Sequence, residues 1–149
     1  MRMMVALFGG TPTSRLFTYV REKLSLCYYC AARFDRLTGL MFVDSGVEKQ
    51  NGRKACDEIL RQLDCVRRGE FTDEELTATR LLMQTSLEAV GDSLSATEEW
   101  YLTQIVGGAQ YSAKDESALL DEVTREDVIA AAGQVTLDTV YFLTGKEAE

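Results

Sequence analysis

Two short apolar runs, residues 26–35 and 39–47, constrain the fold more than any other feature of this chain. Both runs are rich in aromatic and β-branched side chains, and only the residues RLT separate them before Gly39 opens the second run. Paired runs with a short, glycine-containing connection are typical of an antiparallel β-hairpin. The sequence therefore predicts a hairpin early in the chain.

The remaining periodic segments are helical. The stretch FTDEEL begins a helix, with Phe71 as a hydrophobic staple, Thr72 as the N-cap and Glu75 as the capping-box partner. A second capping box begins at Thr124. The predicted helices are 14–23, 52–68, 72–90, 94–106, 114–122 and 125–133, with a loop at 9–13 and a closing strand at 136–145. This order predicts an α+β fold, an antiparallel-rich sheet with several helices packed on one face.

The length of the chain favours one domain. It has 149 residues, of which 46% are hydrophobic, enough to form a core. No linker long enough to divide residues 1–149 is present. The opening MRMMVALFGG is too short an apolar run for a signal peptide. This opening segment is interpreted as the end of a structural element, so we expect a domain truncated at its N-terminus. No apolar run in the chain approaches the roughly 20 residues that span a membrane.

The absence of histidine from the sequence restricts the chemistry. It excludes a Ser-His-Asp triad, a Cys-His pair and any histidine-ligated zinc within this chain. Cys27 and Cys30 form a C-x-x-C in a predicted strand, where residues three apart face opposite sides. Cys56 and Cys65 are nine apart on a predicted helix and also face away from each other. We expect buried, reduced thiols in a cytoplasmic protein, with no cofactor in this chain.

The charge of the chain disfavours nonspecific binding to nucleic acid or to an anionic membrane, since its net value is −8. Residues 1–69 carry 12 basic and 7 acidic groups, whereas residues 70–149 carry 4 basic and 17 acidic groups. One interpretation is a solvated acidic helical half. The other is a basic N-terminal surface that meets an acidic partner or peptide.

The combined order of motifs resembles a known family. The stretch FGGTPTSRLFTYVREKLSLCYY is similar to the glycine-rich turn and following block in the second half of the pitrilysin/insulinase zinc peptidases. FTDEEL and VTREDVIAAA fall where that family has corresponding segments. DTVYFLTGKE and YYCAARFD resemble a bacterial subgroup associated with 5-aminopentanol modification of elongation factor P. The resemblance covers nearly the whole chain and implies a processing-peptidase-like half domain.

The resemblance also implies two site residues. Family peptidases hold zinc on an inverted H-x-x-E-H motif in the N-terminal half and complete the site with an arginine and a tyrosine from the C-terminal half. Those residues match Arg21 and Tyr28. Both would donate hydrogen bonds to peptide carbonyls and stabilise a developing oxyanion. Taken from the residues alone, Arg21 could equally be a solvated or ion-paired surface residue, and Tyr28 a sheet-face aromatic.

The implied function is that of a non-zinc C-terminal domain, inactive alone, that contributes peptide substrate binding. Zinc is implied only for a separate N-terminal half or companion subunit, which would be the partner, and the truncation suggests self-association as a homodimer. The alternative function is a noncatalytic scaffold or assembly subunit that has lost peptide handling.

Overall fold

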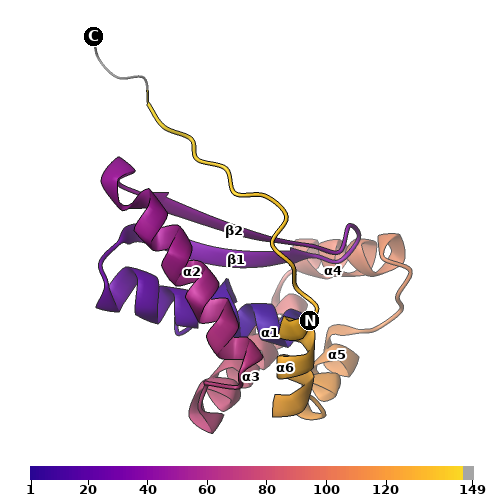
Figure 1. The fold of residues 1–149 in the computed structure, drawn as a ribbon. Coiled ribbons are helices and arrows are strands. Elements are labelled where there is room, and N and C mark those ends of the chain that lie inside the picture. The colour runs from indigo at the N-terminus through magenta and orange to yellow at the C-terminus, as the bar shows by residue number, and fades with distance from the viewer. Residues whose placement is uncertain (146–149) are drawn as a thin grey trace.

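The structure is a computed structural model that describes residues 1–145; residues 146–149 of the predicted domain lie outside the described residues. Figure 1 shows a long hairpin along one side of the molecule, with helices grouped against it. In chain order the elements are α1 (Arg2–Val5), η1 (Ala6–Gly10), η2 (Leu16–Lys23), β1 (Cys27–Asp35), β2 (Leu40–Val47), η3 (Lys49–Asn51), α2 (Gly52–Arg67), α3 (Asp73–Glu88), η4 (Ala89–Asp92), α4 (Leu94–Val106), α5 (Ala113–Asp121) and α6 (Arg125–Gly133).

The predicted hairpin is confirmed. Strands β1 and β2 pair antiparallel, from Cys27 opposite Val47 to Asp35 opposite Leu40. Asp35 closes the turn, because its carboxylate accepts hydrogen bonds from the Leu37 backbone N–H and the Thr38 hydroxyl. Gly39 follows with a φ of 72°, a backbone conformation that glycine adopts without strain. The α+β architecture with an antiparallel sheet is therefore as the sequence predicted.

One face of the hairpin packs on the helices and the other is open. Cys30 and Ala32 of β1 are buried in the core, and Met41 and Val43 of β2 pack against it. The register is interrupted by a β-bulge between Cys27 and Tyr29. The bulge adds one residue to the alternation, so Cys27 and Cys30 lie on the same, inward face. The expectation that these two thiols face opposite sides is thus wrong, because it assumed an unbroken strand.

Helical turn η1 packs against the inward face of the hairpin at very short range. A Cβ on Gly9 would lie 2.7 Å from the Ala32 Cβ and 2.9 Å from the Ala32 backbone nitrogen. Only a residue without a side chain lets the two backbones approach this closely. The sequence analysis placed Gly9 and Gly10 in a loop, which is wrong: they end η1, and the turn follows at Thr11–Ser14.

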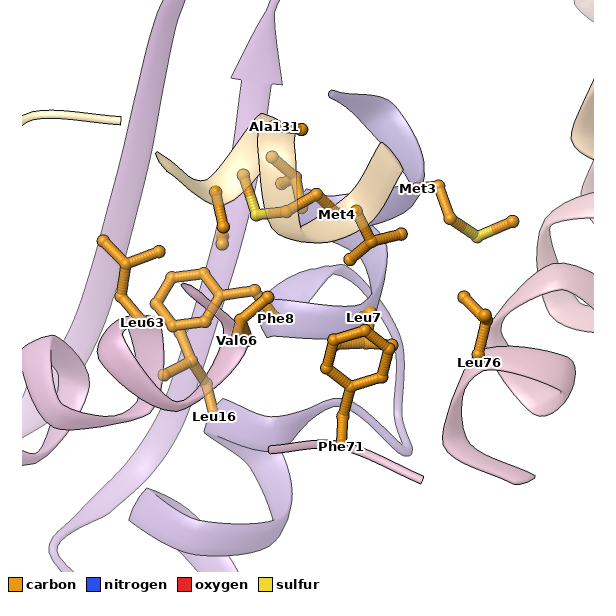
Figure 2. Close-up of a cluster of buried hydrophobic side chains, with 14 of the residues drawn as sticks. Met3, Met4, Leu7, Phe8, Leu16, Leu63, Val66, Phe71, Leu76 and Ala131 are labelled. Atoms are coloured by element: carbon orange, nitrogen blue, oxygen red, sulfur yellow. The ribbon is translucent and has the colours of Figure 1, made fainter. Parts of the chain in front are cut away.

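The core lies where η1, η2, α2 and α6 meet the hairpin. Figure 2 shows Met4, Leu7 and Phe8 pointing into one cluster that also contains Val66 and Phe71, and all five side chains are buried. Among them Met4, Phe8 and Val66 are 0% exposed. The N-terminal helical segment, which the sequence analysis read as the end of a structural element, thus supplies the centre of the core.

The predicted helix boundaries in the second half agree with the structure. Thr72 accepts from the Glu75 backbone N–H, and the Glu75 carboxylate accepts from the Thr72 N–H in return. Thr124 and Asp127 form the same reciprocal cap on α6. Before α3, Gly69 follows the end of α2 with a φ of 71°. No helix among the described residues has the length and apolarity that a membrane span requires.

The predicted closing strand at 136–145 is not a strand in the structure. This segment extends from the end of α6 without pairing to β1 or β2, the only strands among residues 1–145 (Figure 1). Its contact with the body includes the ring of Phe142, which would lie 3.1 Å from a Cβ on Gly52. Strand propensity reflects packing on neighbouring strands, so a suitable sequence remains unpaired where no neighbour is available.

Removal of the α3 cap tests the contribution of the capping box. Thr72→Ala should lower the free energy of unfolding by about 1 kcal/mol, since it leaves the Glu75 N–H without its acceptor. Urea denaturation measures the difference. The matched control is Thr77→Ala on the exposed side of α3, which should be neutral or slightly stabilising because alanine is the better helix former. Equal losses in both variants would contradict this account.

A methyl group at Gly9 tests the close approach of η1 to β1. Gly9→Ala should destabilise the protein by about 1–3 kcal/mol, because the new Cβ overlaps the side chain and backbone of Ala32. Gly133→Ala is the control, since nothing lies within 4 Å of a Cβ at that position. Thermal unfolding of the two variants should show a loss only for Gly9→Ala.

Candidate functional site

The backbone between Arg21 and Tyr28 is irregular at three consecutive places. Helix η2, which carries Arg21, is wound as a π-helix, with the Leu24 N–H donating to the Tyr19 carbonyl at 3.2 Å. Ser25 then has a φ of 48°, the single positive value for a non-glycine residue among the described residues. The β-bulge at the start of β1 follows directly. Such irregularities concentrate at functional sites, where they redirect particular side chains.

The bulge directs two neighbouring tyrosines outward. In an unbroken strand Tyr28 and Tyr29 would face opposite sides, but here Tyr28 is 84% exposed and Tyr29 46% exposed. The ring of Tyr29 lies over Gly46 of β2, where a Cβ would be 2.7 Å from the ring. The Ser45 hydroxyl donates to the Tyr29 carbonyl at 2.8 Å, which fixes the backbone beside the bulge.

An open hollow lies beside this bulge. It is bounded by the turn before β1, by the end of β2 and by the start of the helices that follow β2; its lining residues are Ser25, Leu26, Cys27, Tyr28, Tyr29, Gly46, Val47, Glu48 and Asn51. We call this feature the tyrosine hollow. The lining residues thus include two tyrosines, a glutamate, an asparagine, a serine and a cysteine beside the apolar Leu26 and Val47, a set that can bind a ligand through both stacking and hydrogen bonding.

Arg21 lies on η2, two residues before that helix ends, and does not line the tyrosine hollow. Its side chain is 38% exposed, with its guanidinium carbon 4.6 Å from the centroid of the Phe17 ring. The Arg21 Nε lies 3.8 Å from a carboxylate oxygen of Glu22, a long and exposed ion pair of little strength. Both predicted site residues are therefore solvent-accessible, and neither is held by a buried ion pair.

The two inward thiols behind the hollow differ in exposure. Cys27 is half-buried and lines the hollow, whereas Cys30 is buried beneath it. Burial raises the pKa of Cys30 to about 12, and the neighbouring Cys27 thiol adds to this increase. All four cysteines are free. Among residues 1–145 there is no cluster of three or more histidine, cysteine or acidic side chains that could hold a metal ion.

Tyr28 is the one lining residue of the hollow that the sequence analysis named as a site residue; it missed the other eight, among them Ser25, Tyr29, Gly46 and Glu48. The sequence did contain one signal of this arrangement. Two large aromatic residues in succession, Tyr28 and Tyr29, cannot both face solvent in a regular half-buried strand, which indicates either one buried tyrosine or a bulge. The positions of Gly46 and Glu48 follow from the strand register, which local sequence does not specify.

The family of the chain follows from comparison with known proteins. The family model described as "Peptidase M16 inactive domain" matches residues 1–83, which include the hairpin, Arg21, Tyr28 and the whole tyrosine hollow. The chain belongs to this family, the pitrilysin/insulinase peptidases that its sequence resembles. It is an inactive-type C-terminal domain of a pitrilysin-like protein.

Individual relatives agree with this assignment. The chain is 35% identical over 141 residues to the "probable inactive metalloprotease YmfF" of Bacillus subtilis, covering 95% of this chain and 33% of that protein. A conserved protein from Enterococcus faecalis superposes with a TM-score of 0.79 at 27% identity, covering 89% of this chain and 31% of the other. A protease from Helicobacter pylori superposes with a TM-score of 0.78 at 16% identity, covering 89% and 33%. The chain thus spans about a third of the length of these relatives. The narrower resemblance to the elongation factor P subgroup stays a prediction.

The raised pKa of Cys30 has a measurable consequence. At pH 8 its thiolate fraction should be about 10³-fold lower than that of a thiol with the ordinary pKa of ~8.5, so its alkylation should be slower by a similar factor. Pulsed iodoacetamide labelling followed by mass spectrometry measures each cysteine separately. Cys30 should react at an ordinary rate after unfolding in urea. Rapid alkylation of Cys30 in the folded protein would show that the inward face of β1 is open.

Proposed function

We propose that this chain is the peptide-binding, non-zinc domain of a pitrilysin-type protein and is inactive alone. Arg21 and Tyr28 are the residues that contact the substrate. The single observation that supports this proposal most is the run of irregular backbone that separates them: a π-wound helix, a positive φ at Ser25 and a β-bulge. Backbone irregularities cluster at functional sites, and these three lie together within residues 16–29.

The chemistry available to the two residues is hydrogen-bond donation. The guanidinium of Arg21 offers several N–H groups in a fixed fork, and the phenol of Tyr28 offers one O–H. Directed at peptide carbonyls, such donors position an extended substrate and stabilise negative charge that develops on a carbonyl oxygen during attack. Exposure of both side chains in this chain alone is consistent with a site that closes only against a second domain.

The residues of this chain do not fit a zinc site. The sequence contains no histidine, and the described residues form no cluster of three suitable ligands. The peptidase chemistry of such a protein would therefore depend on a separate N-terminal half or companion subunit, for which the greater length of the relatives leaves room. This chain contributes binding and orientation, with no metal-dependent step of its own.

The test of this function is an arginine substitution in the complete assembly. Arg21→Ala should leave the free energy of unfolding of this chain within about 0.5 kcal/mol of wild type, since the side chain is partly exposed and makes no strong ion pair. Combined with the zinc-bearing half, the same variant should lower kcat/KM for peptide hydrolysis about 10²–10³-fold if Arg21 stabilises the oxyanion. The matched control is Arg68→Ala, which removes an exposed, ion-paired arginine at the far end of α2. Loss of folding with unchanged activity per folded molecule would show that Arg21 is structural.

A second candidate function is that of a noncatalytic assembly subunit, and helix α4 favours it. Leu94, Tyr101, Leu102, Ile105 and Val106 are all exposed and lie within one broad stripe along this helix. An exposed apolar stripe of this kind marks an interaction surface. If assembly is the function, Ile105→Asp should abolish association with a partner or with a second copy, whereas Arg21→Ala should change neither assembly nor activity.

A further inference from the structure

We propose that the tyrosine hollow binds a cationic side chain, lysine or arginine, of an extended peptide. This inference rests on the proposed peptide-binding function and names the substrate class that the hollow selects. Its basis is the set of residues that line the hollow, which includes Tyr28 but not Arg21.

The walls of the hollow provide aromatic faces that are accessible to a ligand. Tyr28 and Tyr29 are both exposed although each could have packed inward, and the bulge is the reason that both are available. The Tyr29 ring is held over Gly46, where only the absence of a side chain leaves room for it. Cations bind to the faces of tyrosine rings through the ring quadrupole, so this pair of rings can receive an ammonium or guanidinium group.

The charge of the hollow has the sign that a cation requires. Glu48 is its one carboxylate, and no lysine or arginine is among the described residues that line it. The Gln50 side-chain amide donates to Glu48 Oε2 at 2.9 Å, which restrains the carboxylate. The N-terminus of α2, next to Asn51, opposes the binding of a cation, because a helix N-terminus carries roughly +0.5 of an elementary charge. The full negative charge of Glu48 exceeds that partial charge.

The backbone at the bulge can hold the main chain of the same peptide. Tyr28 has no partner on β2, because the register passes from Cys27 to Tyr29. The extra residue of a bulge lies outside the strand ladder, so its N–H and carbonyl groups are available to an extended ligand. A peptide bound there would present alternate side chains toward the sheet face, with one entering the hollow.

The test is an NMR titration of this chain with the peptide acetyl-Ala-Val-Lys-Val-Ala-amide and with analogues in which norleucine or glutamate replaces the lysine. The lysine peptide should bind roughly five- to tenfold more tightly than the norleucine peptide, as one exposed cation–π contact and one exposed ion pair together allow. The glutamate peptide should bind most weakly. Resonances of Tyr28, Tyr29 and Glu48 should shift, and the lysine preference should decrease with added salt.

Two variants and a control separate the contributions. Glu48→Gln should remove most of the preference for lysine over norleucine, and Gly46→Ala should weaken binding of the lysine peptide because the new Cβ displaces the Tyr29 ring. Glu70→Gln is the control, since it removes an equally exposed carboxylate that pairs with Arg68 far from the hollow. Its lysine preference should equal that of wild type.

The possible failures can be told apart. Equal binding of all three peptides would overturn the cation preference while leaving the peptide-binding function intact. Tighter binding of the glutamate peptide would show that the N-terminus of α2 determines the selectivity, and would likewise overturn it. Absence of binding for every peptide would reject the inference, whereas the Arg21→Ala assay in the complete assembly tests the proposed function separately.

Discussion

The approach of η1 to the hairpin, through the contact of Gly9 with Ala32, is the constraint on which the rest of the structure depends. It places the N-terminal helical segment directly on the inward face of β1, so that Met4, Leu7 and Phe8 become the centre of the core. Helices α2 and α6 then pack around those side chains rather than on the strands themselves. A sheet of only two strands has too little surface to organise a domain of this size, and the buried N-terminal segment supplies the centre of the core.

The parts of the fold that sequence could predict are those specified by neighbouring residues. The capping boxes at Thr72 and Thr124 determine helix starts through contacts three residues apart, and both were predicted correctly. The hairpin turn at Asp35–Gly39 is equally local. The bulge before Tyr29 and the unpaired segment 136–145 depend instead on what lies across the sheet, which no local pattern records. The error about Cys27 and Cys30 has the same origin. A single residue inserted into a strand reverses the face of the sheet toward which the preceding side chains point.

The candidate site also has a part that the sequence could predict and a part that it could not. Family resemblance identified Arg21 and Tyr28, and the structure adds the residues around Tyr28 that sequence reasoning left out. The surroundings of the two residues differ chemically: Arg21 stands over the Phe17 ring at the end of a helix, whereas Tyr28 borders a hollow whose one charged lining group is Glu48. A peptide held by both would meet a cationic donor at one point and an anionic wall at another. Under the proposed function, such an arrangement would set the direction in which a peptide lies as well as its position.

The unpaired segment 136–145 has a consequence for the behaviour of the protein in solution. Leu137, Val140, Tyr141, Phe142 and Leu143 are all exposed within seven residues that contain one charged group and no proline. Short segments of this composition stack into cross-β fibrils when nothing else keeps them apart. In this chain the opposing force is the net charge of −8, which repels one molecule from the next and disappears as the pH falls toward the isoelectric point of about 4.6. We therefore expect ordered aggregation through segment 136–145 to be more favourable in acid than near neutral pH, where the net negative charge keeps the molecules apart.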